Sequence, residues 1–258
     1  MLIITVILFP LNSCRKTSEP VRYVIEADKI STHKPISDKQ KQFLADFIPR
    51  ITYENDCIRL QRSQLLDLIQ ELQNGKSPDD KEKRKINALL RNYDKQPFVW
   101  EDGPPDSTVH NRLIDLKANV DVIPVKLVMA QAIIESAWGT SRFARKGNNY
   151  FGIHCYKEGC GMKPSDVPEA TFEVKVFDTP DEAISTYLHI LNTGYAYKKL
   201  RKLRAEMRRN NEPLEPEKLA TGLEHYAQIG DKYITLIHKI IDEYLPEDIP
   251  ALLTEARD

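Results

Sequence analysis

One acidic residue stands where the surrounding sequence predicts burial. Glu135 lies in segment 124–137, which is otherwise almost wholly apolar and reads as a helix opened by a proline. A helix that is apolar on all sides is usually enclosed by a protein core, and burial raises the pKa of an isolated carboxyl group. A carboxylic acid that stays protonated near neutral pH can act as a general acid. The alternatives are a solvent-facing Glu135, or one paired with Arg142 or Lys126.

Aromatic and polar residues follow this acid. Trp138 comes three positions after Glu135, on the same face of the predicted helix, where an indole desolvates an acid and stacks on sugar rings. Residues 148–152, Asn-Asn-Tyr-Phe-Gly, form a turn suited to lining a glycan site. The alternative is a capped turn with its aromatic rings in the core. The candidate substrate-binding residues are therefore Trp138, Asn149, Tyr150 and Phe151.

The cysteines indicate a short covalent loop. Cys155 and Cys160 bracket four residues that include Gly159, which lets the chain turn back. We predict a Cys155–Cys160 disulfide. A zinc site that adds His154 is the weaker alternative, because three ligands cluster there and a structural zinc site uses four. Cys57 is left over and is interpreted as a small, buried, hydrophobic side chain.

The N-terminal residues predict export. Residues 2–11 are apolar but fall short of the roughly 20 residues that cross a bilayer as a helix. Their length suits a secretory signal. The following Leu-Asn-Ser-Cys resembles a bacterial lipobox, so we predict lipidation at Cys14 and a lipid anchor to the outer membrane, in the cell envelope or periplasm. The alternatives are an ordinary cleaved signal or a buried apolar strand.

Composition excludes several classes of function. The chain has 258 residues, with 41% hydrophobic and 29% charged side chains, which is typical of a globular protein. Its 37 basic and 38 acidic residues nearly cancel, so no nucleic-acid partner is expected. The common glycine-rich nucleotide fingerprints are absent from the sequence.

Helical periodicity dominates, with a small β element. Ser37 is a predicted N-cap with Gln40 completing a capping box, Pro49 is expected to disturb that first helix, and a second stretch ends near 74–75. Further helices are predicted near 78–93, 108–117, 124–137, 180–191, 195–209, 216–224 and 230–244. Segment 171–177 alternates and is β-branched, which predicts a strand. The expected divisions are a signal peptide with lipobox (1–13), a tether (14–35), an N-terminal helical region (36–100), a catalytic domain (101–247) and a tail (248–258).

Two motifs carry a family resemblance. Residues 131–141, which contain Glu-Ser-Ala-Trp-Gly, followed by Asn-Asn-Tyr-Phe-Gly-Ile at 148–153, resemble the glucosaminidase family of bacterial peptidoglycan hydrolases. The cysteine loop at 155–160 and the tyrosine-containing segments 191–197 and 219–226 resemble its proteobacterial Bax-type subgroup. Segment 43–62 in the front half is also similar, so the resemblance spans most of the chain.

The resemblance implies a fold and a reaction. The fold would be lysozyme-like and mainly α (α+β), with an α lobe and a small β lobe flanking a glycan groove. The reaction would be hydrolysis of the β-1,4 bond from N-acetylglucosamine to N-acetylmuramic acid in peptidoglycan, with Glu135 as general acid. The family also draws a second acid from the β lobe. Glu173 is our choice, Glu169 and Asp166 are alternatives, and assistance by the substrate's 2-acetamido group needs none of them.

Other assignments remain open at this stage. Tyr226 falls where the family carries a groove tyrosine, although helix packing explains it equally well. The basic segment 197–209 is interpreted as a solvated helix face, with contact to peptide carboxylates or lipid headgroups as the alternative. Rival functions are a muramidase or lytic transglycosylase on the same fold, and a non-catalytic glycan-binding lipoprotein. The chemistry needs no metal or cofactor, and the expected partners are glycan strands and a membrane surface.

Overall fold

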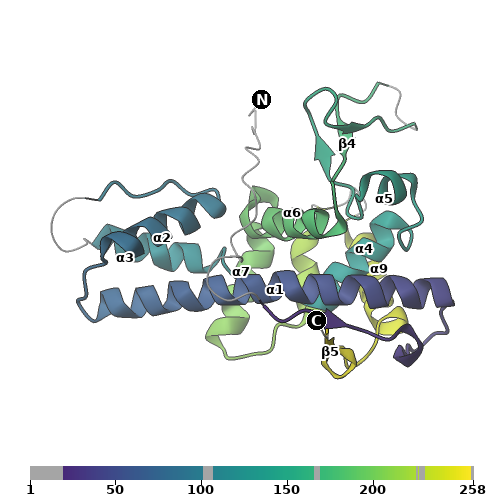
Figure 1. Ribbon diagram of the computed structural model, residues 1–258, viewed down its shortest axis with the longest axis horizontal. Helices are drawn as coiled ribbons and strands as arrows, with labels where there is room; N and C mark the ends of the chain where they lie inside the picture. The colour runs from purple at the N-terminus through teal and green to yellow at the C-terminus, as the bar shows by residue number, and fades with distance from the viewer. Residues whose placement is uncertain (1–19, 101–106, 166–168, 225, 227–229, 257–258) are drawn as a thin grey trace.

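A computed structural model describes residues 20–100, 107–165, 169–224, 226 and 230–256. The predicted signal, Cys14 and Asp166 therefore lie outside the described residues. Helix α1 runs the length of the molecule, with α2 and α3 packed along one end and α4, α5 and α9 at the other (Figure 1). In chain order the elements are β1 (Tyr23–Val24), η2 (Ala27–Lys29), α1 (Asp38–Gln73), α2 (Asp80–Asn92), α3 (Ser107–Lys117), α4 (Val125–Ser136), α5 (Arg142–Gly147), β2 (His154–Cys155), β3 (Gly161–Met162), β4 (Glu173–Lys175), α6 (Pro180–Thr193), η3 (Tyr195–Tyr197), α7 (Lys198–Arg209), α8 (Pro216–Ala220), η4 (Thr221–Leu223), α9 (Asp231–Tyr244), η5 (Pro250–Leu252) and β5 (Thr254–Glu255).

Helix α1 is one continuous helix of 36 residues rather than the two that were predicted. The capping box of Ser37 and Gln40 is present, and the helix ends at Asn74 before Gly75, as expected. Pro49 lies inside it. A proline in a helix interior costs about 3 kcal/mol, but side chains on both sides of it, Phe47, Ile48 and Ile51, are fully buried. Each such burial contributes about 1.5–3 kcal/mol, so packing outweighs the lost backbone bond.

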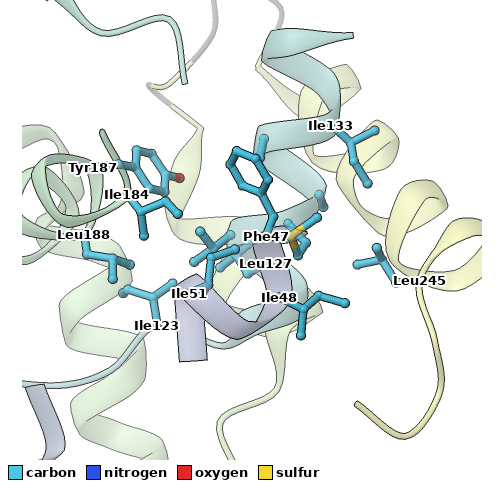
Figure 2. Close-up of a cluster of buried hydrophobic side chains, with 14 of the residues drawn as sticks. Phe47, Ile48, Ile51, Ile123, Leu127, Ile133, Ile184, Tyr187, Leu188 and Leu245 are labelled. Carbon is cyan, nitrogen blue, oxygen red and sulfur yellow. The ribbon is translucent and has the colours of Figure 1, made fainter. Parts of the chain in front are cut away.

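Helix α4 occupies the centre of the main core, as its apolar sequence predicts. Leu127, Val128, Met129 and Ala130 are completely buried although they point in successive directions around the helix. The surrounding side chains come from α1, α6 and α9 and from the chain entering α4 (Figure 2). The labelled neighbours in that view are Phe47, Ile48, Ile51, Ile123, Ile184, Tyr187, Leu188 and Leu245.

A second hydrophobic cluster fills the other end of α1. Its buried members come from the C-terminal half of α1, from α2, from α3 and from the adjoining loops: Leu65, Ile69, Ile86, Leu90, Tyr93, Phe98, Val109, Leu113, Leu116 and Val120. Helix α3, placed in the catalytic domain by the sequence, thus packs with the N-terminal region. The predicted boundary at 100–101 does not separate two cores, because α1 contributes to both clusters.

The ends of the described chain are part of the fold, which differs from the predicted tether and tail. Strand β1 pairs with β5 in antiparallel register, so residues near 23 and 255 lie side by side. Ile25 and Ile30 are buried in the main core. A strand of two residues is too short to show a periodic pattern, so these strands were not predictable from the sequence.

The β lobe is a three-stranded antiparallel sheet with the order β2-β4-β3. Its central strand β4 has three residues, fewer than the predicted 171–177. The predicted Cys155–Cys160 disulfide is present and closes the chain between β2 and β3. Cys57 is buried as predicted but is not a free thiol. The mainly α class with a small β element is confirmed.

The predicted helices of the back half are present, with an additional short helix α5 capped by Ser141. Helix α6 begins at Pro180, and the Thr179 side chain caps it. Several cations of the basic segment are used internally, because Arg201 donates to the carbonyls of Leu191 and Gly194 and Arg204 is buried. None of the described helices has the length and apolar character needed to cross a bilayer.

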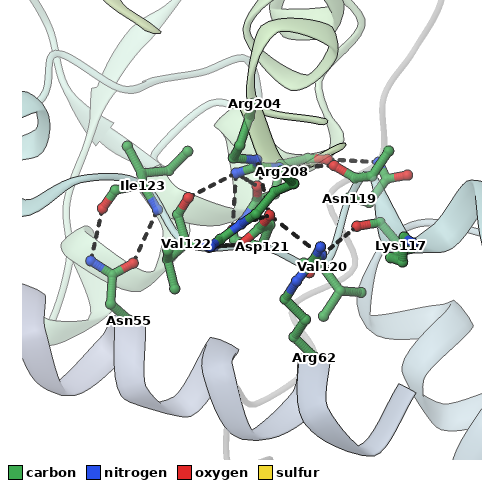
Figure 3. A network of polar contacts seen from close by, with 12 residues as sticks. Asn55, Arg62, Lys117, Asn119, Val120, Asp121, Val122, Ile123, Arg204 and Arg208 are labelled. Carbon is green, nitrogen blue, oxygen red and sulfur yellow. Dashed lines mark hydrogen bonds and ion pairs between the residues drawn. The ribbon is translucent and has the colours of Figure 1, made fainter. Parts of the chain in front are cut away.

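A buried acidic residue connects the loop before α4 to helices α1 and α7. Asp121 lies in the loop between α3 and α4 and is 2% exposed. Its carboxylate accepts two hydrogen bonds from Arg208 on α7, at 2.9 and 3.1 Å, and lies 3.4 Å from Arg62 on α1 (Figure 3). Arg204 is fully enclosed beside it and donates to the carbonyls of Asp121, Val122 and Ala118. Burial lowers the pKa of Arg204 to about 10.

The same loop is fixed to α1 by an amide. The Asn55 side chain donates to the Ile123 carbonyl at 2.8 Å and accepts from the Ile123 N–H at 3.1 Å, just before α4 begins. Arg62 adds bonds to the carbonyls of Lys117 and Val120. The entry of α4 is therefore held by polar contacts, while its body is held by apolar ones.

Replacing Asp121 should destabilise the whole protein. Asp121→Asn leaves Arg204 buried without its counter-charge, and breaking one side of a buried pair costs about 3–5 kcal/mol. Urea unfolding followed by circular dichroism measures this loss. Asp46→Asn is the control, because Asp46 forms an exposed pair with Arg50, for which about 0–1 kcal/mol is expected. Equal effects of the two variants would contradict a central role for the network.

Candidate active site

Glu135 lies in the last turn of α4 and is partly buried. Its Oε1 accepts a hydrogen bond from the Tyr233 hydroxyl of α9 at 2.8 Å. Burial raises the pKa of Glu135, and the bond from Tyr233 lowers it by a smaller amount. Neither Arg142 nor Lys126 forms an ion pair with it in the described part of the chain, and Arg142 instead donates to the Lys163 carbonyl. The acid is thus desolvated with a neutral partner, which favours its protonated form.

A chain of hydrogen bonds orients Tyr233. Its hydroxyl oxygen accepts from Gln131 Nε2 at 3.1 Å, and Gln131 Oε1 accepts from the Tyr187 hydroxyl of α6. Because the oxygen of Tyr233 is already an acceptor from Gln131, its proton is directed at Glu135. Gln131 lies one turn before Glu135 and is fully buried. The sequence interpretation missed all three of these residues. The i, i+4 spacing of Gln131 and Glu135 in an apolar helix was the one available signal.

A left-handed turn follows directly after Glu135. Ala137, Trp138 and Gly139 have φ values of 49°, 59° and 72°, and each non-glycine residue in this region costs about 1–2 kcal/mol. Ser136 stabilises the turn, because its hydroxyl donates to the Ala132 carbonyl and accepts from the Gly139 N–H at 2.7 Å. Close packing is a second reason for a glycine at position 139, since a Cβ there would lie 2.9 Å from the Phe43 ring.

The position of Trp138 differs from the prediction. The helix ends at Ser136, so Trp138 stands in the left-handed turn rather than on the helix face of Glu135. Its indole is partly exposed and meets the rings of Phe43 and Tyr244 edge-on, with centroids 6.2 Å apart in both cases. The ring is therefore positioned by α1 and α9 while part of it remains accessible.

Asn149 holds the following loop in shape. It is 2% exposed, its amide nitrogen donates to the carbonyls of Ile153 and Lys175, and its oxygen accepts from the N–H groups of Phe151 and Ile153. A side-chain amide offers two donors and two acceptor positions, so all four are occupied. The Asn149 side chain thus has no polar group left for the predicted contact with a glycan.

The aromatic residues of the loop are divided between core and surface. Phe151 is buried and stacks on Tyr187, with centroids 4.1 Å apart and planes at 4°. Tyr150 is partly exposed and packs against Phe47. Gly152 has a φ of 64°, and a Cβ on it would lie 3.5 Å from Glu135 Oε2. A side chain here would cover the oxygen that Tyr233 leaves free, so Gly152 keeps the acid accessible.

Tyr226 belongs to the aromatic group around Tyr233. Its ring stacks on that of Tyr233, with centroids 5.5 Å apart, and its hydroxyl donates to the Phe151 carbonyl at 2.5 Å. Tyr197 lies 6.2 Å from Tyr226, ring to ring. The structure thus brings Tyr226 close to the acid, as the family resemblance implied, and connects it to the loop of Gly152.

Glu173 has contacts other than those expected of a groove residue. Its side chain is 8% exposed and turned toward the cysteine loop, where one oxygen accepts from the Gly161 N–H at 2.8 Å and the other from the Gly159 N–H at 3.3 Å. Both carboxylate oxygens are engaged within the β lobe. Glu169 is exposed just before β4. The catalytic role predicted for Glu173 stays a prediction.

The cysteine loop groups three possible metal ligands, but its disulfide prevents them from binding a metal. Sulfur and carboxylate atoms of Cys155, Cys160 and Glu173 lie within 4.8 Å of one another, but the disulfide removes both thiolates that a metal would need. His154, the third ligand of the zinc alternative, stacks on Phe172 with centroids 4.0 Å apart. The donor set of the described residues fits no metal in this oxidised form.

Comparisons with known proteins agree on one family. Residues 110–245 match the glucosaminidase family model, described as mannosyl-glycoprotein endo-beta-N-acetylglucosaminidase. The chain is 31% identical over 195 residues to "Protein bax" of Escherichia coli (strain K12), covering 76% of this chain and 66% of that protein. The match thus falls just short of two thirds of the relative's length. No solved structure matches.

Removing the Tyr233 hydroxyl should raise the pKa of Glu135 further. Tyr233→Phe deletes the one hydrogen bond that lowers this pKa and leaves the desolvation in place. The shift is measured by NMR titration of ¹³C-labelled glutamate carboxyl groups, with Glu135→Gln identifying the signal. Tyr226→Phe is the matched control, since it removes a hydroxyl bonded to the Phe151 carbonyl instead. A fall in the pKa in Tyr233→Phe would contradict the proposed balance of burial and hydrogen bonding.

Proposed function

The chain belongs to the glucosaminidase family and to its Bax type, and from this we propose that it is a glycoside hydrolase of peptidoglycan. The bond we propose is the β-1,4 linkage from N-acetylglucosamine to N-acetylmuramic acid. The observation that carries the proposal is Glu135 itself, a partly buried acid with a raised pKa, a neutral hydrogen-bond donor on one oxygen and an open approach to the other.

Glu135 is the proposed general acid. Its free oxygen, beside Gly152, is the one able to give a proton to the leaving glycosidic oxygen as the bond breaks. The Tyr233 hydroxyl then stabilises the carboxylate that forms, because a hydrogen bond to a charged oxygen is stronger than one to a neutral oxygen. Tyr233 thereby acts on the developing charge, and Gln131 keeps its proton correctly directed.

We propose that the substrate's own acetamido group is the nucleophile of the first step, in which Glu135 protonates the leaving oxygen. Both oxygens of Glu173 are engaged by backbone N–H groups, which argues against its activating a water. The 2-acetamido oxygen attacks the anomeric carbon as the bond to the leaving oxygen breaks, which needs no carboxylate nucleophile. Water then opens the cyclic intermediate, and the Glu135 carboxylate takes the proton of that water. Glu173 then serves the reaction indirectly, by holding the cysteine loop against β4.

Substrate contact and location complete the proposal. The partly exposed rings of Trp138 and Tyr150, both positioned by α1, are the proposed stacking surfaces for sugar rings. Such a substrate requires a location in the cell envelope, and the lipobox-like residues before Cys14 support attachment to the outer membrane by a lipid.

Replacing Glu135 should abolish turnover while the protein still folds. General acid catalysis contributes about 10²–10⁴-fold, so Glu135→Gln should lose activity by at least that range. The measurement is digestion of purified peptidoglycan with mass spectrometry of the released fragments. New reducing N-acetylglucosamine ends are expected for the wild type and not for the variant.

The digestion experiment has a matched control, and its products distinguish the alternative functions. Glu169→Gln removes an exposed carboxylate near the same lobe and should leave the product pattern unchanged. Reducing muramic acid ends, or 1,6-anhydro ends, would replace the proposed bond with that of a muramidase or lytic transglycosylase. No fragments at all, from folded protein that binds the glycan, would make it a binding protein.

Glu173→Gln separates a loop-holding role from a catalytic one. The amide group of glutamine would face backbone N–H donors, and an unmatched buried polar group costs about 1–3 kcal/mol. We expect a lower melting temperature, faster reduction of the Cys155–Cys160 disulfide by dithiothreitol and a raised KM. A loss of kcat of a thousandfold or more with unchanged stability would instead establish Glu173 as the second catalytic acid.

A further inference from the structure

A basic pocket lies on α2, far from Glu135. Its volume is about 440 Å³, within the range of small-ligand sites. It is lined by Asp80, Lys83, Arg84, Asn87, Arg91 and Trp100. All of these residues precede the region that the family model matches. Nothing in the proposed glycosidase chemistry uses them.

The charges of this α2 pocket are unbalanced. Three of its lining residues are cations and one is an acid, and Lys83 lies 4.0 Å from Asp80. Arg84 and Arg91 are exposed and form no ion pair with any residue that the structure describes. They are seven positions apart, so both guanidinium groups project from one face of α2 about 10 Å apart along its axis. The pocket is therefore suited to a ligand with more than one negative group.

The wall of the pocket opposite α2, formed by residues 98–100, is held in place by hydrogen bonds. The Asn87 amide donates to the Phe98 carbonyl at 2.9 Å and accepts from the Phe98 N–H at 2.7 Å, which holds the chain of residues 98–100 against the helix. Phe98 and Trp100 pack ring to ring, with centroids 5.2 Å apart. The Lys83 ammonium lies 5.8 Å from the centre of the Trp100 ring.

One buried donor in this wall is unsatisfied. The indole Nε1 of Trp100 is enclosed and has no hydrogen-bond partner among the described residues. An indole N–H in a protein interior normally finds an acceptor. The indole nitrogen is enclosed, so a ligand in the pocket would meet the Trp100 ring, while the cationic side chains supply the donors for an oxygen-rich anion.

We propose that the α2 pocket binds the carboxylate groups of the peptides attached to peptidoglycan, an inference that rests on the proposed function. Planar guanidinium groups bind carboxylates through paired hydrogen bonds, and the Trp100 ring provides an apolar surface beside them. Helix α1, about 54 Å long, separates this end of the molecule from α5 and the end of α4 (Figure 1). The pocket is then a second attachment point on the same polymer, which raises avidity without a new contact at the acid.

The test measures binding to a peptide that contains no glycosidic bond. A synthetic stem peptide, L-Ala–γ-D-Glu–diaminopimelate–D-Ala, is titrated into the full-length protein by calorimetry. Arg84→Gln/Arg91→Gln should weaken binding at least tenfold. The matched control, Lys81→Gln/Lys85→Gln, removes two charges from the same helix outside the pocket and should stay within twofold. The same peptide with its carboxyl groups amidated should not bind.

Contrary results are distinct from failure of the proposed function. Absence of peptide binding, or equal weakening by the two double variants, would overturn the α2 pocket as a peptide site. Inorganic phosphate binding as tightly as the peptide would do the same, since the pocket would then select any small anion. Digestion of peptide-free glycan strands should be unchanged in Arg84→Gln/Arg91→Gln. If the wild type digests nothing yet binds the peptide, the hydrolase proposal fails and the pocket stands.

Discussion

The structure depends on enclosing a helix that has no polar face. Residues 127–133 of α4 are buried on every side, so α1, α6 and α9 must close around them together. That enclosure also brings the Tyr233 hydroxyl of α9 to the last turn of α4, where Glu135 emerges. The packing that stabilises the fold and the environment that tunes the acid are thus produced by the same contacts. Any change that loosens α9 from α4 alters both.

Two buried carboxylates in this molecule have opposite surroundings. Asp121 forms ion pairs with arginines from α1 and α7, which connect these helices to the loop before α4. Glu135 is met by a tyrosine hydroxyl and apolar walls, without a cation among its described partners. A paired charge resists losing its partner, whereas a lone acid against a neutral donor changes its protonation readily. This difference in partners distinguishes a structural ion pair from the acid that we propose as proton donor.

The sequence pattern predicted those features that depend on residues close together in the chain. The apolar surroundings of Glu135 indicated burial, and the cysteine spacing indicated the disulfide, because both depend on neighbours in sequence. The partner of Glu135 was not predictable in this way, since Tyr233 lies 98 positions away and only tertiary packing brings it close. Pro49 was misjudged because the cost of a proline is local while the packing that offsets it is not. The contacts of Glu173 with the Gly159 and Gly161 N–H groups were not predictable either, because strand alternation does not show which face the cysteine loop covers.

The structural domain is larger than the region that the family model matches, because it includes helix α1. The family-matched region begins at residue 110, after α1 has ended. Yet Phe47 and Ile51 of α1 form part of the wall around α4, and Phe43 contacts the turn that follows Glu135. Excised at the family boundary, the remaining chain would expose an apolar surface that α1 now covers, and the left-handed turn would lose its support. The family-matched region of this protein therefore depends on the long helix before it, which supplies one wall of its core.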